Sequence, residues 1–511
     1  MAISLKSCLT LWFLGAGGVL AEATEPLSVI DWLSNSVATA VPPPATMDET
    51  SGASAPEVVR VLPLDTPVPD AAGVVDPSAL GIPSDFWGRS SAADLANALG
   101  RIRLSPDAPP TLSRFLSDFL QARLDPPIDA AVDDRLFFAR VDRLLEKGHL
   151  DAARALVEAT EVAGPQAFRR LFDVSLLQGA ETEACRKIEA IPDLSPTYSA
   201  RIFCLARLGE FDVAALTLGN AETLGILSPE EDALLLHFLD PELFEGEPIP
   251  PAPKVPTPLQ FRLYEAVGER ISTEGLPLAF AFADMSTDVG WKARLSAAER
   301  LATSEAISFQ HLLGVYRERG PSASGAVWER IRAITALADA LEDQDGPALV
   351  HALPSAWGAA DQAGYTALLA LWLNQSLPLI EVPNRATHIA FEAALLAGNA
   401  EQAERFASSG AGDQFLLSIA RDQVGSVAAA DPLGRAVLRG LSGVRTGSTL
   451  EGLISDDRRG EALLRAFEYL SDGAPGNPNI TSQALTAVRQ LGLNDLARQI
   501  AVELILKEGA I

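Results

Sequence analysis

The sequence predicts an all-α fold, in which helix-turn-helix repeats form an α-solenoid behind a disordered tether. Apolar residues recur at helical spacing from Ser84 onward. A glycine followed five residues later by an alanine recurs at a period of about 31 residues. Nearly half of the 511 residues are apolar (48%), so the chain has ample material for a core. No alternating β pattern of useful length is present.

Residues 1–21 are predicted to be a secretory signal peptide. Lys6 precedes an apolar run, Leu9 to Leu20, and cleavage is expected after the small residue Ala21. A membrane anchor is the alternative, but spanning a bilayer takes about 20 apolar residues, and this run is shorter and is followed by acidic residues. We therefore expect an exported, periplasmic protein of a bacterial envelope, with no integral membrane segment after cleavage.

The composition constrains the partners. The formal net charge of −27 repels phosphate backbones and anionic lipid surfaces, which argues against a nucleic-acid partner. We expect instead a protein or peptide partner in the cell envelope.

Residues 22–83 are predicted to be a disordered tether, because they are rich in Pro, Ala and Ser and lack sustained periodicity. A short apolar island at 25–37 interrupts the tether. The island either docks on a partner as a linear motif or folds back on the helical body of this chain. Its apolar residues are Leu27, Ile30, Trp32 and Leu33.

Helices of about 10 to 15 residues follow the tether. Residues 84–240 are predicted to be N-terminal helical repeats, and 259–511 C-terminal helical repeats. The Pro-rich stretch 241–258 cannot continue a helix, so we expect a linker or long loop there.

The repeated glycine and alanine have a physical reason in a helical hairpin. The glycine ends the first helix in a left-handed turn, and the alanine lets the second helix approach the first closely. The pairs are Gly148/Ala153, Gly179/Ala184, Gly209/Ala214, Gly398/Ala403 and Gly492/Ala497.

These hairpins resemble the tetratricopeptide repeat family, which also has a Pro seventeen residues after the glycine, as Pro165 and Pro196 are here. The period is shorter than the family's, Ile226 replaces the third Pro, and the small residue of the first helix is replaced by a larger one. The replacements are Val141, Phe172 and Ile202. The resemblance implies a degenerate, tetratricopeptide-like solenoid whose concave face binds peptide segments.

Cys185 and Cys204 remain after processing. They lie at similar distances from one turn, on antiparallel helices, and the expected compartment is oxidising, so we predict a structural disulfide between them. Two buried free thiols are the alternative.

We find no catalytic, cofactor-binding or metal-binding constellation in the sequence. The histidines are single, without the spacing of a zinc site. They are His149, His237, His311, His351 and His388. Asp343 to Gly346 superficially matches a calcium loop, but Leu341 and Ala352 occupy its first and last ligand positions, so we interpret it as a hairpin turn.

These observations favour a non-catalytic periplasmic scaffold or adaptor that binds an envelope protein through its helical surface. Two other classes stay open. One is an accessory protein of a cell-wall enzyme, or such an enzyme itself. The other is a small-ligand binder with a cleft near residues 241–258.

Overall fold

The computed structural model describes residues 68–508, except 106–107, 131–133, 161–163, 321–324, 378–381, 384, 430, 446 and 473–476. Throughout these ranges the regular secondary structure is helical, without a β-strand, and one isolated parallel bridge joins Val75 to Ala122. The prediction of an all-α fold is confirmed. Within the same ranges no helix is both long enough and apolar enough to cross a membrane. The predicted signal peptide and the island at 25–37 lie outside the described residues.

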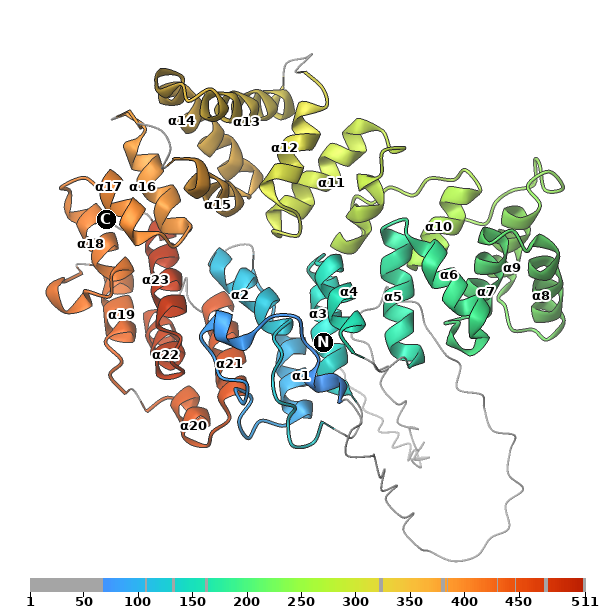
Figure 1. Ribbon diagram of the computed structural model, residues 1–511, viewed down its shortest axis with the longest axis horizontal. Helices are drawn as coiled ribbons and strands as arrows, with labels where there is room; N and C mark the ends of the chain where they lie inside the picture. Colours follow the sequence, from blue (N-terminus) through green and yellow to red (C-terminus); the bar gives the residue numbers. More distant parts are fainter. Residues whose placement is uncertain are drawn as a thin grey trace, which may run out of the picture.

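The first helices form the middle of the molecule in Figure 1. They are α1 (Ala92–Arg101), α2 (Pro110–Leu120), α3 (Arg135–Glu146) and α4 (Leu150–Glu158). The hydroxyl of Ser91 caps α1 by accepting a hydrogen bond from the Asp94 backbone N–H, and Pro110 occupies the first turn of α2, where a missing N–H costs nothing.

Residues 68–83 correct the predicted extent of the tether, because they are folded against α2 and α3. They contain the short 3-10 helices η1 (Pro69–Ala71) and η2 (Pro77–Leu80). The buried Asp70 carboxylate accepts a 2.6 Å hydrogen bond from the Phe137 backbone N–H at the start of α3.

Arg140 of α3 explains why this segment folds. Its guanidinium is fully buried, and it donates hydrogen bonds of 2.8 to 3.0 Å to the backbone oxygens of Asp70, Leu120 and Ala122. A buried cation needs such partners, so α3 holds the segment through its backbone. The composition of 68–83 alone gives no sign of this contact.

An arm of stacked hairpins follows α4. Its helices are α5 (Pro165–Leu177), α6 (Glu181–Ala190), α7 (Tyr198–Arg207), α8 (Phe211–Thr223) and α9 (Pro229–Leu239). From α3 to α9 each helix packs on the next, and α8 lies at the far end of the arm in Figure 1. The side chains from Phe168 to Tyr264 form a hydrophobic cluster of their own.

The repeated glycines have the predicted geometry. Each pair of glycine and alanine joins two consecutive helices, namely α3–α4, α5–α6, α7–α8, α16–α17 and α22–α23. All five glycines adopt a left-handed backbone: the φ angles are 78° for Gly148, 67° for Gly179, 91° for Gly209, 74° for Gly398 and 85° for Gly492. The assignment to a tetratricopeptide-like solenoid stays a prediction, because hairpins alone do not define a superhelix.

The repeated alanines pack inside the hairpins and belong to no accessible surface. Each is the fourth residue of the second helix of its hairpin, and each is buried. The exposed fractions are 1% for Ala153, 6% for Ala184, and 0% for Ala214, Ala403 and Ala497. A small side chain at this position lets the two helices lie close together, as predicted. These five residues are therefore structural, and none of them can contact a partner of the folded chain.

The Pro-rich stretch after α9 forms a loop and leads into α10 (Pro258–Ala266). The helix α10 packs back on α5 and α9, and the Tyr264 hydroxyl donates a 3.0 Å hydrogen bond to the Pro250 carbonyl. The chain therefore turns back along the arm at this point. The following 3-10 segment, η4 (Leu278–Met285), contacts α3 and α5.

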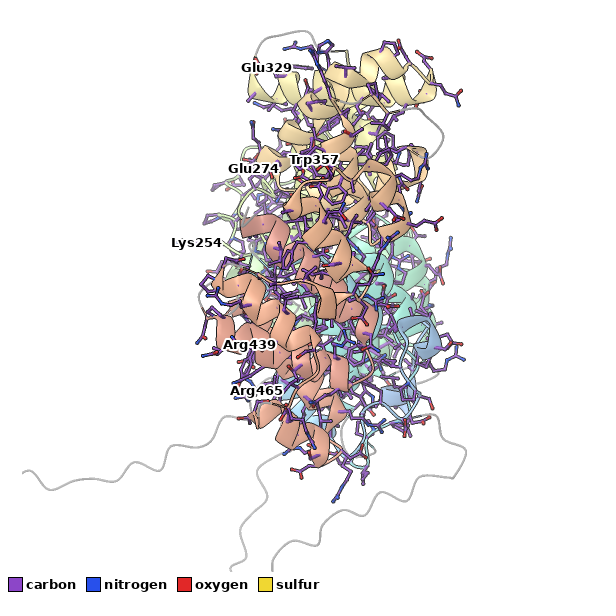
Figure 2. All side chains as sticks on the ribbon, turned by 90° about the vertical axis from the view of Figure 1, so that its left-hand side faces the viewer. Lys254, Glu274, Glu329, Trp357, Arg439 and Arg465 are labelled. Carbon is purple, nitrogen blue, oxygen red and sulfur yellow. A yellow bond between two sulfur atoms is a disulfide. The ribbon has the colours of Figure 1, made fainter. Side chains whose placement is uncertain are left out.

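The remaining helices curve around the centre and return to it (Figure 1). They are α11 (Trp291–Thr303), α12 (Phe309–Arg317), α13 (Ala326–Glu342), α14 (Gly346–Ala363), α15 (Thr366–Ser376), α16 (Thr387–Leu396), α17 (Ala400–Phe406), α18 (Ala411–Ala420), α19 (Pro432–Leu441), α20 (Thr449–Ser455), α21 (Arg459–Asp472), α22 (Pro478–Gln490) and α23 (Asn494–Glu508). In Figure 2 these helices extend from Glu329 at one end to Arg465 near the other.

The C-terminal helices close the structure onto its beginning. The helix α1 packs on α21, and α2 packs on α23. The Arg89 backbone N–H donates a 2.7 Å hydrogen bond to the Asp457 carbonyl, and buried Glu503 accepts hydrogen bonds from the Thr111 backbone N–H (3.0 Å) and hydroxyl (2.6 Å). The helices before and after the Pro-rich loop thus share one large hydrophobic cluster.

Candidate functional site

Among the described residues, no group of three or more His, Cys, Asp or Glu side chains could hold a metal ion. The turn at Asp343 to Gly346 joins α13 to α14, with Gln344 in the left-handed region (φ 54°). The Asp345 carboxylate accepts a 3.0 Å hydrogen bond from the Ala348 backbone N–H, which is a helix cap. The interpretation of this stretch as a hairpin turn is confirmed.

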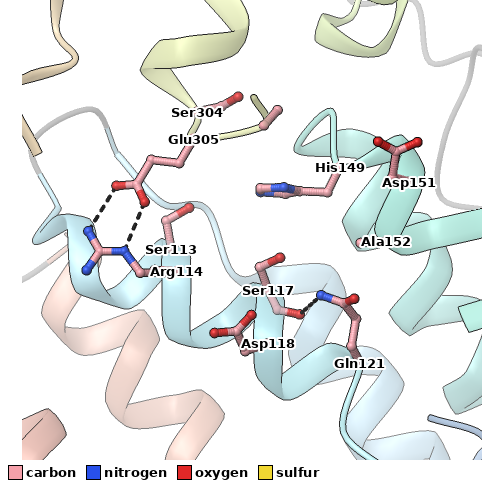
Figure 3. A pocket seen from close by; sticks show the side chains of 11 residues that line it. Ser113, Arg114, Ser117, Asp118, Gln121, His149, Asp151, Ala152, Ser304 and Glu305 are labelled. Atoms are coloured by element: carbon pink, nitrogen blue, oxygen red, sulfur yellow. Dashed lines mark hydrogen bonds and ion pairs between the residues drawn. The ribbon is translucent and has the colours of Figure 1, made fainter. Parts of the chain in front are cut away.

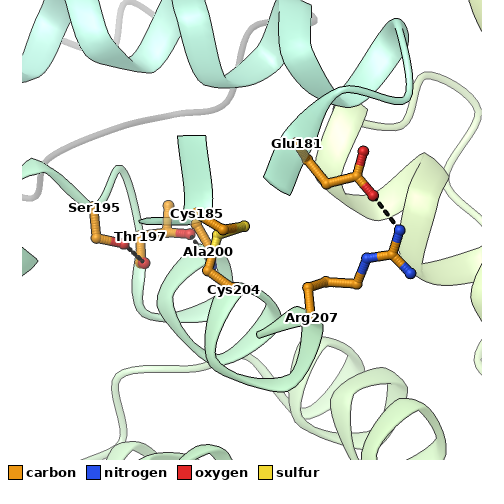
Figure 4. The surroundings of a disulfide bond; sticks show 7 residues. All are labelled: Glu181, Cys185, Ser195, Thr197, Ala200, Cys204 and Arg207. Atoms are coloured by element: carbon orange, nitrogen blue, oxygen red, sulfur yellow. Dashed lines mark hydrogen bonds and ion pairs between the residues drawn. A yellow bond between two sulfur atoms is a disulfide. The ribbon is translucent and has the colours of Figure 1, made fainter. Parts of the chain in front are cut away.

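The predicted disulfide is present in the arm (Figure 4). Cys185 of α6 and Cys204 of α7 are bonded through their sulfur atoms, and their Cα atoms are 4.8 Å apart. Both residues are buried in the hydrophobic cluster of the arm. The disulfide therefore fastens the α5–α6 hairpin to the α7–α8 hairpin.

An ion pair supports the same junction. Glu181 at the start of α6 pairs with Arg207 at the end of α7, as Figure 4 shows. The Thr197 hydroxyl caps α7 by accepting a 3.0 Å hydrogen bond from the Ala200 backbone N–H. The helix α7 is thus held at both ends, and it forms a firm support for α8, which packs against it.

The helix α8 has a buried apolar face and a second, exposed group of apolar residues. Ala214, Leu218 and Ala221 of α8 are buried, and they lie on one face. Val213, Leu216 and Leu224 follow one another at spacings of three and eight residues, which places them together on a neighbouring, solvent-exposed face that also includes Asn220. They are 44%, 66% and 69% exposed. We call Val213, Leu216 and Leu224 the α8 stripe.

The segment that contains the α8 stripe, residues 191–255, is unusually rich in exposed apolar side chains. Of the thirteen large apolar residues that are exposed in the described part of the chain, nine fall between residues 191 and 255. They are Ile191, Tyr198, Phe211, Val213, Leu216, Leu224, Ile226, Leu243 and Val255. Single exposed apolar residues are ordinary, whereas a concentration of them indicates an interaction surface.

The same region is strongly acidic. Residues 191–255 contain eleven Asp and Glu but only three Lys and Arg. Asp212 and Glu222 are exposed on α8 itself, and Glu230 and Glu231 begin α9 just after the turn. Burial, with the negative charge of Glu222 as a smaller cause, raises the pKa of Asp232 above its ordinary value. The apolar surface of the arm is therefore flanked by carboxylates that repel one another.

A second candidate is a cavity at the centre of the molecule, shown in Figure 3. It has a volume of about 290 Å³ and lies where α2, the start of α4 and the α11–α12 turn meet. Its charged side chains are Arg114, Asp118, Asp151 and Glu305. Arg114 donates two hydrogen bonds, of 3.0 and 3.2 Å, to the Glu305 carboxylate across the junction.

The chemistry of this central cavity is that of a polar contact between packed segments. Burial raises the pKa of Asp118 above its ordinary value, and burial lowers the pKa of His149 to about 4, so that this imidazole is neutral near pH 7. The only guanidinium of the lining is paired with a carboxylate. Ligand sites are predominantly apolar with a few converging polar groups, which this lining does not match. The cavity also lies away from the cleft predicted near residues 241–258.

Comparison of the chain with protein-family models, with curated proteins and with solved structures finds no match in any of the three.

The sequence and the structure indicate different candidate surfaces for binding a partner. The predicted docking residues Leu27, Ile30, Trp32 and Leu33 lie outside the described residues, so that hypothesis stays a prediction. The α8 stripe was not recognised from the sequence, although a signal was present. Apolar residues occur all around α8, and a helix with that pattern is either buried on every side or in contact with something else.

Proposed function

We propose that this protein is a non-catalytic scaffold or adaptor of the bacterial periplasm, which binds an envelope protein through its helical surface. The observation that carries the proposal is the exposure of the α8 stripe, Val213, Leu216 and Leu224. The helix α8 itself lies at the end of the arm (Figure 1). Water-exposed leucines in register on one helix gain free energy when a partner covers them.

The framework of the arm supports this proposal. A binding surface loses less conformational entropy on association when its backbone is already held in place. Here the disulfide between Cys185 and Cys204 and the ion pair between Glu181 and Arg207 fix α6 and α7 beneath α8. The disulfide supports the proposed export of the chain, because disulfides form in oxidising compartments.

Site-specific crosslinking tests the proposal. A photoreactive residue is placed at position 216 of the full chain, and at position 444 as a matched control, because Leu216 and Val444 are 66% and 67% exposed. We expect one envelope protein, identified by mass spectrometry, to crosslink from 216 and not from 444. The same protein must then bind the purified chain. If no protein distinguishes the two positions, the adaptor function of this surface is wrong.

A further inference from the structure

The chemistry around the α8 stripe restricts what can cover it. The stripe extends over about three turns of α8, from Val213 to the C-cap residue Leu224, with exposed Asn220 one turn from each leucine. A second helix can pack its apolar face along such a surface. Asp212 lies four residues before Leu216 and is therefore beside it on the helix surface, whereas Glu222 is exposed on the flank of α8 nearer to Asp232 of α9. An occupant must therefore combine an apolar face with charges that suit these carboxylates.

The charge of this chain argues against two possible occupants. A second copy would bring another eleven acidic residues of the 191–255 region against the first, and like charges placed opposite each other are repelled. The chain's own residues 22–67 contain seven Asp and Glu and one Arg, so they would meet the same repulsion. Neither occupant matches the apolar and the acidic features of the surface together.

We propose that the α8 stripe binds a cationic amphipathic helix of the partner protein, whose apolar residues cover Leu216 and Leu224 while its Lys or Arg residues meet Asp212 and the other carboxylates of the surrounding acidic surface. This inference rests on the proposed adaptor function and assigns the chemistry of the partner segment. The apolar contact supplies affinity, and the charges select the partner and accelerate the encounter.

Three synthetic peptides test the proposal with the purified full chain. Each has the 13-residue length of α8 and carries leucines at helical spacing, and the remaining positions are all Lys, all Gln or all Glu. We expect the Lys peptide to bind most tightly, with an affinity that falls as salt is raised to about 0.5 M, because exposed charges are then screened.

Matched variants show whether the Lys peptide binds at the stripe. Leu216→Gln with Leu224→Gln should weaken its binding about tenfold or more, since two leucine contacts are lost. Val444→Gln, at an equally exposed site elsewhere, should leave the binding unchanged. Folding of the variants is checked by circular dichroism, and it should be retained because the substituted side chains are exposed.

A second pair of variants isolates the charge. Asp212→Asn with Glu222→Gln should reduce both the affinity for the Lys peptide and its salt dependence. Glu329→Gln with Asp343→Asn removes the same two charges from exposed positions on α13 and the turn after it, and should change neither.

The outcomes separate this inference from the proposed function. If the Gln or Glu peptide binds the stripe as tightly as the Lys peptide, the cationic partner is wrong, while the stripe stands as a docking surface. If the Lys peptide binds but the leucine variants have no effect, its binding is general attraction to an acidic protein, and the inference fails. If no peptide binding depends on Leu216 and Leu224 and no protein crosslinks at position 216, both proposals fail.

Discussion

Loss of the buried ion pair between Asp142 and Arg170 should destabilise the junction of the first two repeated hairpins. Asp142 lies on α3 and Arg170 on α5, and the two side chains make hydrogen bonds of 2.5 and 2.8 Å. Their side chains are 6% and 0% exposed, and the Arg170 guanidinium also lies 4.4 Å from the centre of the Phe138 ring. The arginine is thus surrounded by protein on all sides.

The expected cost follows from this burial. In Asp142→Leu the buried Arg170 guanidinium loses its ionic partner and keeps only its 3.1 Å hydrogen bond to the Gln166 backbone carbonyl. Removing one partner of a buried pair typically costs about 3–5 kcal/mol, because the remaining charge has been taken out of water without compensation. Replacing both partners, as Asp142→Leu with Arg170→Met, removes that charge and should leave the free energy of unfolding nearly unchanged.

Urea denaturation followed by circular dichroism measures these differences, and hydrogen exchange shows whether α3 and α5 are the helices affected. An exposed pair is the control. Arg317 and Asp339 are 2.8 Å apart with side chains 37% and 64% exposed, so Asp339→Leu should cost less than about 1 kcal/mol. The reasoning is refuted if Asp142→Leu costs no more than Asp339→Leu, or if the double variant is less stable than the Asp142 single variant.

Three further predictions use the same measurements. Gly209→Ala should lower the free energy of unfolding by about 1 kcal/mol because the φ angle of Gly209 is +91°, whereas Gly219→Ala, inside α8, should raise it by about as much. A Cβ at either position would meet no atom within 4 Å, so the backbone conformation alone should cause the difference. Equal effects of the two variants would contradict this explanation. Burial lowers the pKa of His149 to about 4, so on acidification the unfolded chain binds a proton at this residue before the folded chain does. The free energy of unfolding should therefore fall by up to about 1.4 kcal/mol per pH unit between pH 6.5 and 4. His149→Asn should abolish this dependence on pH. Reduction of the bond between Cys185 and Cys204 should destabilise the arm by about 3 kcal/mol, seen as faster hydrogen exchange in α6 and α7 with no change in α13.

The hairpins that could be predicted from the sequence are those that have a glycine at the turn between their two helices. The α20–α21 hairpin has the same geometry but was missed, because Asp457 occupies the left-handed position (φ 59°) and Ala462 is buried five residues later. Glu305 and Gln344 likewise have positive φ between α11 and α12 and between α13 and α14. Asp and Asn tolerate this conformation and other residues adopt it at a cost, so a search for glycine finds only part of the repeats.

Contacts between residues far apart in the chain could not be predicted from the sequence, for a different reason. The folding of residues 68–83 depends on Arg140, and the closure of α1 on α21 depends on residues about 370 positions apart, such as Asp85 and Arg459. Local periodicity gives the face that a helix buries, but it does not give the helix that covers this face. The disulfide was predictable because its two cysteines flank a single turn.

The position of α8 in the row of hairpins strengthens the case that its stripe is functional. A row of stacked hairpins has two ends, and each end exposes the apolar face that the next hairpin would cover, so terminal repeats normally carry a polar outer face. Here the row begins at α3, and the helices that precede it, α1 and α2, are covered by α21 and α23. At the far end of the row, Val213, Leu216 and Leu224 of α8 are exposed. A terminal cap without a binding role would have polar residues there. The acidic residues around the stripe repel a second copy of the chain and attract a basic segment, so the apolar surface can stay accessible without self-association.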